Sequence, residues 1–349
     1  MYEERVIEFL KGIKKTDNIV IIFNNDGDGI CSCALIKKFL EKVGADPYII
    51  SQPMPPDKFL QKKIQTTVPT KMIFLDMAID QQPQIVKRFS SICDILIIDH
   101  HTIARDMNSK AIVHYNPRFD KKSLYQSTTY CAYKLCSSIE DFSQHLWIAA
   151  VGMVSDYNLE DSQDIVTEVV KKYSVEKELY KSIFGRLADM IAYTRSTGLL
   201  SCEQMVQLIC EAESLENLEH TKNYDKLLQS FQIIDNEISA IVDDAEKNAE
   251  RIGNVIFYPI KSRYGLSSIV STRLSEKYMD KIVIIYEKNK PGAKVSARNQ
   301  SRKYDIGKLL QKAMHGIKGS AGGHEAAAGA TMPSKDWEKF KEQLIALVG

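Results

Sequence analysis

Hydrophobic residues in the first third of the chain form short runs separated by amphipathic segments. The runs are rich in β-branched residues and almost continuously apolar, which is typical of strands buried on both faces. They occupy residues 18–23, 48–50, 72–75, 95–98 and 111–114. The segments between them have helical spacing, and residues 29–44 end at a glycine, as helices often do. This alternation predicts an α/β domain with a mostly parallel sheet and helices on both sides.

The pattern changes twice further along the chain. From about residue 123 to residue 251 the strand-like runs give way to helical periodicity, and the acidic residues 235–253 are expected to form a long connector helix. Strand and helix patterns return after Gly253. We therefore predict an α/β domain over residues 1–160, a helical extension and connector over 161–252, and a smaller C-terminal α/β domain over 253–349.

The charge is distributed unevenly along the 349 residues, whose formal net charge is only +1. Residues 253–349 contain 17 Lys and Arg against 8 Asp and Glu, so the rest of the chain is acidic. A basic C-terminal domain suggests a polyanionic partner. The alternative is a solvated, lysine-rich surface.

The cysteines and the N-terminus indicate a cytoplasmic protein. The seven cysteines are odd in number and include no CxxC pair, which fits a reducing compartment better than a disulfide framework. Cys31 and Cys33 are expected to be small core residues of a helix. The N-terminal segment is charged and amphipathic and contains no apolar run of membrane-spanning length, so we expect neither a leader nor a membrane partner.

Acidic and histidine residues follow several of the predicted strands. The first strand runs into "NNDGDG", the third ends at Asp76, and the fourth ends in "DHH". Because the carboxyl ends of parallel strands form the ligand crevice of an open sheet, these side chains should converge. Asp156 follows an apolar stretch and is expected to join them. Each of these acids taken singly also has a structural explanation. Asp26 and Asp28 could form a turn with a helix cap, Asp76 could be a structural acid, and Asp156 could cap a helix.

So many carboxylates at one place imply bound cations, because they would otherwise repel one another. Oxygen ligands with imidazole suit Mn²⁺, with Mg²⁺, Co²⁺ and Zn²⁺ as alternatives. A pair of ions bridged by a shared carboxylate suits in-line attack on phosphorus. Adjacent side chains of an extended segment face opposite ways, so His100 and His101 are expected to point apart, one to metal and one to phosphate.

Taken together, these motifs resemble the DHH phosphoesterase superfamily with a C-terminal DHHA1 domain. The resemblance rests on "DGDG" at residues 26–29, "DHH" at 99–101 and "GGHEAAAG" at 322–329, and it spans nearly the whole chain. The superfamily contains RecJ-type exonucleases, oligoribonucleases and cyclic-dinucleotide phosphodiesterases. The wording of "DGDGICS" and of "HYNPR" at residues 114–118 is most similar to the archaeal RecJ-like branch.

The resemblance implies roles for individual residues. One divalent ion is expected on Asp26 and Asp76, with Asn24 as a weak third ligand, and a second on Asp28, Asp76, His100 and Asp156, with Asp76 bridging. His101 would contact the scissile phosphate, and Asp99 would orient a histidine. The implied substrate-binding residues are Ser296, Arg298, Gly322, Gly323 and His324. The sequence departs from the family at Asn24, where His or Asp is usual, and at Ala321, where a third glycine is usual.

Three functions remain open at this stage. The first is an Mn²⁺-dependent exonuclease of DNA repair that hydrolyses single-stranded DNA or RNA from an end. The second is a nanoRNase or cyclic-dinucleotide phosphodiesterase acting on very short substrates. The third is a catalytically weak scaffold subunit of a replication or repair complex, with a GINS-like partner, and homo-oligomers are compatible with all three. A pyrophosphatase is disfavoured because the relatives with that activity have a different C-terminal domain.

Overall fold

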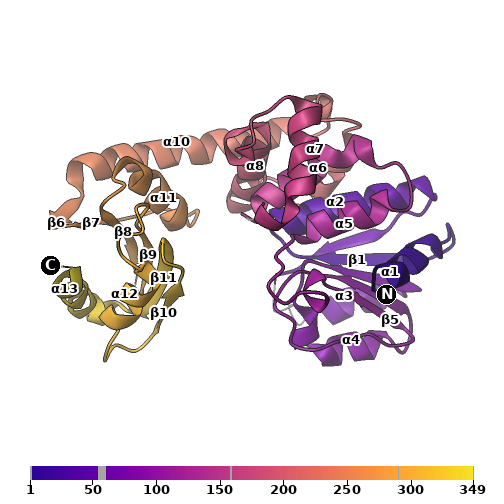
Figure 1. Ribbon diagram of the computed structural model, residues 1–349, viewed down its shortest axis with the longest axis horizontal. Coiled ribbons are helices and arrows are strands. Elements are labelled where there is room, and N and C mark those ends of the chain that lie inside the picture. Colours follow the sequence, from indigo (N-terminus) through magenta and orange to yellow (C-terminus); the bar gives the residue numbers. More distant parts are fainter. Residues whose placement is uncertain (1, 54–59, 158, 290, 349) are drawn as a thin grey trace. The chain divides into compact units, whose positions relative to one another are not determined.

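The computed structural model describes residues 2–53, 60–157, 159–289 and 291–348. The chain forms two compact units, one ending at Phe231 and the other beginning at Gln232 (Figure 1). No helix within these described ranges is both long and apolar enough to cross a bilayer. The seven cysteines are all free thiols.

The first unit is built on a parallel sheet of five strands. The strands are β1 (Ile19–Phe23), β2 (Tyr48–Ser51), β3 (Lys71–Leu75), β4 (Asp94–Ile98) and β5 (Ile112–Tyr115). Their order is β2-β1-β3-β4-β5, and every neighbouring pair is parallel. The sheet therefore confirms the predicted α/β fold class. From β1 the chain adds β2 on one side and then β3, β4 and β5 on the other, so the strand order switches between β1 and β3. Open parallel sheets bind ligands at such a switch point.

Alternate residues of each strand belong to different hydrophobic cores. Ile21 and Phe23 of β1 belong to one core, and Val20 and Ile22 belong to the other. Figure 1 shows α2 and α5 over one face of the sheet and α3 and α4 over the opposite face. The first five helices are α1 (Tyr2–Lys11), α2 (Gly27–Lys42), α3 (Leu60–Thr67), α4 (Pro83–Phe89) and α5 (Thr128–Ser137). Burial on both faces explains why the strands are apolar throughout.

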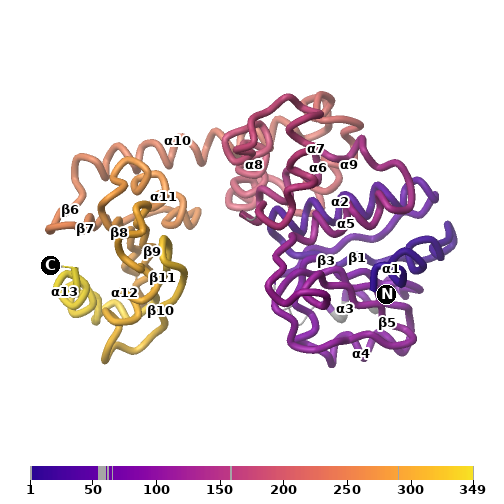
Figure 2. The backbone as a smooth tube through the Cα atoms, viewed as in Figure 1, coloured from indigo at the N-terminus to yellow at the C-terminus, as the bar shows by residue number. Residues whose placement is uncertain are grey.

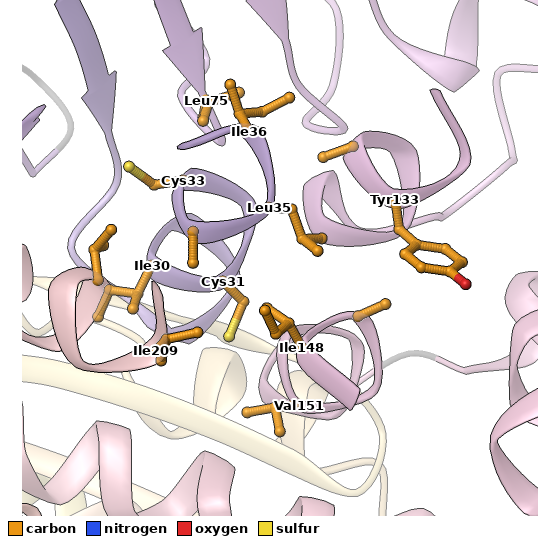
Figure 3. Close-up of a cluster of buried hydrophobic side chains, with 14 of the residues drawn as sticks. Ile30, Cys31, Cys33, Leu35, Ile36, Leu75, Tyr133, Ile148, Val151 and Ile209 are labelled. Carbon is orange, nitrogen blue, oxygen red and sulfur yellow. The ribbon is translucent and has the colours of Figure 1, made fainter. Parts of the chain in front are cut away.

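Helix α2 is enclosed by neighbours on every side. Its residues Cys31 and Cys33 are 0% exposed, which confirms that they are core residues. Figure 3 shows its side chains among those of four other elements, labelled Leu75, Tyr133, Ile148, Val151 and Ile209. Burying one such aliphatic side chain stabilises a fold by roughly 1.5–3 kcal/mol. The N-terminus of α2, which carries the acidic motif, is therefore firmly anchored.

The rest of the first unit is helical, as its periodicity predicts. These helices are α6 (Leu146–Ser155), α7 (Gln163–Tyr173), α8 (Ile183–Thr197) and α9 (Cys202–Glu211). Helix α9 packs beside α2 (Figure 2). Short 3-10 turns also occur in this unit, at η1 (Ile79–Gln81), η2 (Pro117–Phe119), η3 (Ser143–His145), η4 (Glu160–Ser162), η5 (Leu179–Lys181) and η6 (Leu218–His220), and the second unit contains η7 (Ser334–Asp336). The connector helix is α10 (Tyr224–Asn248), which begins before the predicted residue 235.

The second unit is a mixed sheet of six strands. The strands are β6 (Glu250–Ile252), β7 (Val255–Pro259), β8 (Ile282–Lys288), β9 (Gly292–Arg298), β10 (Ser320–Gly323) and β11 (Ala327–Pro333). They lie in the order β10-β11-β9-β8-β7-β6, and only β7 and β8 pair in parallel. Three helices complete this unit, α11 (Ser267–Lys277), α12 (Ile306–Ala313) and α13 (Trp337–Val348). Helices α12 and α13 supply its core with Leu310, Phe340 and Leu344.

Candidate metal and phosphate site

Three neighbouring strands end in the same row of the first sheet. Phe23 of β1 pairs with Leu75 of β3, and Leu75 pairs with Ile98 of β4. The next residue on each strand is therefore Asn24, Asp76 or Asp99. The sequence expectation that strand-end polar residues converge is met at this edge of the sheet.

Two glycines allow the chain to pack tightly at the start of α2. A Cβ atom on Gly29 would lie 2.2 Å from the Asn24 carbonyl oxygen, and one on Gly27 would lie 2.3 Å from Ser155 Oγ. Asp26 caps the helix, because its Oδ1 accepts a hydrogen bond from Gly29 N at 3.0 Å. The close approach at Gly27 also brings the C-terminal end of α6 to this site.

Asp28 connects α2 to the N-terminus of α5. Its Oδ2 accepts a hydrogen bond from Thr128 N at 2.8 Å, and its Oδ1 accepts one from Thr129 N at 2.8 Å. The positive end of the α5 helix dipole also favours a carboxylate there. Asp28 is therefore held in one orientation, and each oxygen retains a lone pair for a further partner.

Asp76 adopts a left-handed backbone conformation with a φ of 57°. Its N–H still donates to Ile98 O at 3.0 Å, so the chain leaves β3 in a sharp turn against β4. Aspartate tolerates this conformation better than most residues. The turn buries the carboxylate, which is only 1% exposed, and Thr128 Oγ1 donates to its Oδ1 at 3.2 Å.

His100 lies between three carboxylates. Its Nε2 is 3.2 Å from Asp76 Oδ1 and 3.9 Å from Asp28 Oδ2, and its Nδ1 is 3.6 Å from Asp156 Oδ2. Asp156, the C-terminal cap of α6, therefore joins the site as expected. Two overlapping groups, Asp28–His100–Asp156 and Asp76–His100–His101, each offer ligand atoms within 4.8 Å of one another.

This cluster fits a divalent cation. Within the described residues, His100 Nδ1 and Asp156 Oδ2 are buried without a hydrogen-bond partner. Such orphaned buried atoms are rare and costly unless another group binds them. Carboxylate oxygens with an imidazole are donors that Mn²⁺, Mg²⁺ and related ions accept.

The electrostatics of the cluster lead to the same conclusion. Burial raises the pKa of Asp156 to about 8, and the nearby Asp28 and Asp26 add to the effect. Burial also raises the pKa of Asp28 and places that of Asp76 well above its usual range. Burial lowers the pKa of His100, which keeps the ring neutral and its lone pair available. A bound cation would allow the carboxylates to ionise together.

His101 and Asp99 form a second feature beside the cluster. His101 Nδ1 lies 2.7 Å from Asp99 Oδ1, and this hydrogen bond raises the pKa of His101. Burial opposes ionisation of Asp99, but the interactions with His101 lower its pKa overall. The expectation that His100 and His101 point apart is wrong, since their ring centroids are 4.6 Å apart. The strand ends at Ile98, so the alternation of an extended segment no longer applies.

Asn24 has a different orientation from the one that metal ligation needs. Its Nδ2 donates to Asp26 Oδ2 at 2.6 Å and to Asp76 Oδ2 at 3.3 Å. Its Oδ1 instead accepts a hydrogen bond from Asn25 N at 2.9 Å. In this arrangement the amide is a donor that links two acids, and Asp26 belongs to neither of the two ligand groups found among the described residues.

Several residues at this site were missed by the motif analysis. Arg118 Nε donates to His100 O at 2.8 Å, and Asn116 Nδ2 donates to His101 O at 3.0 Å, so both histidine carbonyls are held by η2 and its cap. Tyr125 donates to Asp156 Oδ1 at 3.3 Å and packs edge-on against His100. The stretch "HYNPR" was a signal for the first two, whereas nothing in the sequence singled out Tyr125.

The expected substrate-binding residues of the second unit lie on β9 and β10, the two strands that flank β11, and His324 directly follows β10. Ser296 of β9 pairs with Gly329 of β11, which pairs with Gly322 of β10, so the three form one row. Ser296 Oγ lies 2.9 Å from Ser271 Oγ, and Arg298 Nη2 donates to Ser268 Oγ at 3.2 Å. Gly322, Gly323 and His324 are exposed. Gly323 has a φ of 147°, a conformation that suits glycine.

Comparison with known families agrees with this architecture. Residues 18–157 match the DHH family, N-terminal domain, and residues 253–349 match the DHHA1 domain. Together the two matches cover about two thirds of the chain, in the order that the family requires. The chain belongs to the DHH/DHHA1 phosphoesterase superfamily. The domain limits at residues 160 and 252 remain predictions.

Solved structures with a similar fold have low sequence identity to this chain. RecJ from Thermus thermophilus in complex with Mn²⁺ has a TM-score of 0.72 at 16% identity over 99% of this chain, which spans only 54% of that RecJ chain. The pGpG-specific phosphodiesterase PggH from Vibrio cholerae has a TM-score of 0.53 at 14% identity, covering 95% of this chain and 98% of that one. CDC45 from Entamoeba histolytica has a TM-score of 0.55 at 10% identity, covering 99% and 98%. No curated protein sequence matches the chain.

Proposed function

We propose that this protein is a metal-dependent phosphodiesterase that releases nucleotides from an end of single-stranded DNA or RNA. The observation that carries the proposal is the pair of ligand groups that share His100, one of which includes His101, which also bonds to Asp99. When bound, a pair of divalent ions, with Mn²⁺ best suited to these donors, would lower the pKa of a coordinated water and neutralise charge on the phosphodiester.

The residues of the first unit divide the work. Asp28, Asp76, His100 and Asp156 would hold one divalent ion, and Asp26 and Asp76 would hold the other. Asn24 would be a ligand only with its amide oxygen turned away from Asn25 N, from which it accepts a hydrogen bond. His101 has a side chain that is 42% exposed and uses Nδ1 for Asp99, which leaves Nε2–H to donate to a phosphate oxygen. The raised pKa of His101 keeps that proton in place.

The second unit binds the strand by its phosphates. Arg298 presents a planar guanidinium, and the exposed Gly322 and Gly323 allow a phosphate to approach the backbone closely. Ser296 and His324 add further donors. The excess of lysine and arginine after Gly253 supports affinity that does not depend on base sequence.

The test is hydrolysis of end-labelled 20-mers of DNA and RNA with Mn²⁺. We expect stepwise release of mononucleotides by the wild type and none by Asp76→Asn. Asparagine tolerates the left-handed backbone at this position, so the variant removes charge while keeping the turn. Asp94→Asn, an exposed acid at the opposite end of β4, is the matched control and should be fully active. Wild-type turnover by Asp76→Asn would refute the mechanism.

A phosphodiesterase for very short substrates is the second candidate. It is supported by the similar fold of PggH, whose chain this protein covers to 98%. Salt dependence separates the two candidates. Binding of a long strand should weaken with a log–log slope of about 0.7 per neutralised phosphate, while a dinucleotide with one or two contacts should show a shallow slope. Equal affinity for dimers and 20-mers would favour the short-substrate enzyme.

A scaffold role in a replication or repair complex is the remaining alternative. The fold likeness to CDC45 supports it, whereas the buried ligand groups argue for retained metal chemistry. Absence of Mn²⁺ binding in calorimetry, together with no hydrolysis of any substrate above, would favour the scaffold.

A further inference from the structure

A pair of aromatic rings lies next to the candidate metal site, and the mechanism above does not use it. Tyr157 directly follows Asp156, and Tyr180 belongs to the short turn η5. Their ring centroids are 6.0 Å apart and their planes differ by only 12°. Tyr157 is 78% exposed and Tyr180 is 43% exposed. One ring is thus supported by the other and presents most of its surface to solvent.

Tyr180 belongs to the same neighbourhood as Asp156, although it is distant in sequence. Burial raises the pKa of Tyr180 to about 12, and the charges of Tyr157, Asp156 and Glu160 contribute to the shift. Tyr157 directly follows Asp156, and its ring stacks on that of Tyr180. The Tyr157–Tyr180 pair therefore borders the ligand at the C-terminal end of α6.

The backbone of Tyr157 is strained in a way that places its ring at this border. The φ of Tyr157 is 57°, just beyond the C-terminal cap of α6. Left-handed backbone is unfavourable for a residue with a bulky side chain, and glycine or asparagine would occupy it more readily. Strained residues of this kind cluster at ligand-binding sites. This conformation holds an exposed aromatic ring at the edge of the candidate site.

We propose that Tyr157, supported by Tyr180, is a stacking platform for a nucleobase next to the scissile phosphate. This inference rests on the proposed function, because it takes the phosphodiester to lie at the Asp28–Asp76–His100–Asp156 cluster. In a nucleotide the base is joined to the phosphate through a single sugar, so the base adjacent to the cleaved bond must lie near Asp156. Every base has a π-face, so the platform selects nucleic acid over base-free phosphoesters without reading sequence.

The test compares strands that have a base at each position with strands that lack one. An end-labelled 8-mer is made complete, or with an abasic tetrahydrofuran residue at the 5′ end, at the 3′ end or in the middle. The kcat/KM for each is measured with Mn²⁺, and the affinity for each is measured by fluorescence anisotropy without metal. The proteins are the full-length wild type, Tyr157→Ala, Tyr157→Phe, Tyr180→Ala and Tyr48→Ala.

We expect the wild type to prefer the complete strand over one terminally abasic strand by roughly 5- to 150-fold, the range of base–aromatic stacking. Tyr157→Ala should lose this preference in both measurements, Tyr180→Ala should weaken it, and Tyr157→Phe should keep it. Tyr48 is 53% exposed at the start of β2, at the other end of the sheet, so Tyr48→Ala is the matched control and should behave as wild type.

The outcomes separate the two proposals. Hydrolysis of complete and abasic strands at equal rates by the wild type would overturn the stacking platform and leave the phosphodiesterase intact. A preference that persists in Tyr157→Ala would also overturn it. Absence of hydrolysis of every strand would overturn the proposed function, and the metal-free affinities would then decide whether Tyr157 stacks on bases.

Discussion

His101 Nδ1 and Asp99 Oδ1 are 2.7 Å apart, and Asp99 is only 2% exposed. A buried carboxylate thus holds a half-exposed imidazole whose second nitrogen is left for another partner. The neighbouring His100 belongs to both ligand groups, whereas His101 belongs to one of them. Two adjacent histidines therefore have different environments, one ionic and one suited to donate a proton.

Asp99→Asn should reduce kcat by about 10- to 100-fold, the usual cost of removing a partner that orients a functional histidine. The amide keeps the shape of the carboxylate but no longer supports a protonated ring. Mn²⁺ content, measured by elemental analysis, should not change, because Asp99 is outside both ligand groups. His101→Asn combined with Asp99→Asn should be no worse than His101→Asn alone. An additive loss would mean that Asp99 acts independently of His101.

Asp76→Asn should raise the stability of the metal-free protein while abolishing the stabilisation by Mn²⁺. Burial and the charges of Asp28 and Asp26 raise the pKa of Asp76, so at neutral pH folding without metal costs the free energy of protonating this acid, and a neutral amide avoids that cost. For the wild type, Mn²⁺ at 100 times its Kd should add about 2.7 kcal/mol. Thermal unfolding in EDTA and in Mn²⁺ measures both effects. A Tm shift with Mn²⁺ equal to that of the wild type would contradict the shared-ligand role.

Asn24→Asp should lower the Mn²⁺ concentration for half-maximal activity by roughly tenfold, about 1.4 kcal/mol. The Asn24 amide donates hydrogen bonds to Asp26 and Asp76. A carboxylate at this position would repel these two acids unless a cation lay between them, so the substitution should favour metal binding. Asn25→Asp, which adds the same charge one residue further along, is the control and should have a smaller effect. Identical half-saturation for the wild type and Asn24→Asp would place residue 24 outside the metal site.

Arg298→Ala should lower kcat/KM by roughly 30- to 1000-fold, equivalent to about 2–4 kcal/mol for a lost phosphate contact. Metal content should be unaffected, because the ligand groups belong to the first unit. The salt slope of strand binding should fall by about 0.7. Lys335→Ala, in η7 next to the opposite end of β9, removes a positive charge and serves as the control. An unchanged salt slope would show that Arg298 does not contact a phosphate.

His145 should make the first unit less stable in mild acid. Its burial lowers its pKa to about 4 from the usual 6.5. Between these values the unfolded chain binds a proton that the folded one does not, so stability falls as the pH falls. From pH 7 to pH 5 the loss should be about 2 kcal/mol. His145→Phe keeps the ring against Phe142 and should remove this part of the pH dependence in urea unfolding. If the free energy of unfolding fell equally with pH in the wild type and in His145→Phe, His145 would not be the source of the pH dependence.

Much of the first unit could be predicted because buried strands and the residues that follow them have recognisable sequence patterns. Strands covered on both faces must be apolar throughout, and polar residues that follow them must meet at one edge. Asp76 and Asp99 were found in this way. Tyr125 was not, because it lies in a loop that is held by a hydrogen bond from Tyr125 N to the sequence-distant Asp161, and loop sequence carries little information about such contacts.

The second unit shows a different limit. Strands β10 and β11 read "SAGG" and "AAGATMP", which are poor in β-branched and aromatic residues. Their strand conformation comes from pairing, since β11 pairs with β9 along its whole length. Tertiary context therefore outweighed propensity. The side-by-side rings of His100 and His101 were missed because the alternation of an extended strand was applied to residues that follow the end of β4 at Ile98.

The enclosure of α2 has a kinetic consequence. The helix that begins at Asp26 has neighbours on every side, so its backbone amides can reach solvent only if much of the unit opens (Figure 3). Hydrogen exchange from α2 should then report global unfolding rather than local fraying. A metal ion held by Asp28 would add its binding free energy to the free energy of opening, and exchange would slow accordingly. The occupancy of the site could thus be measured in hydrogen-exchange rates, without substrate and without catalysis.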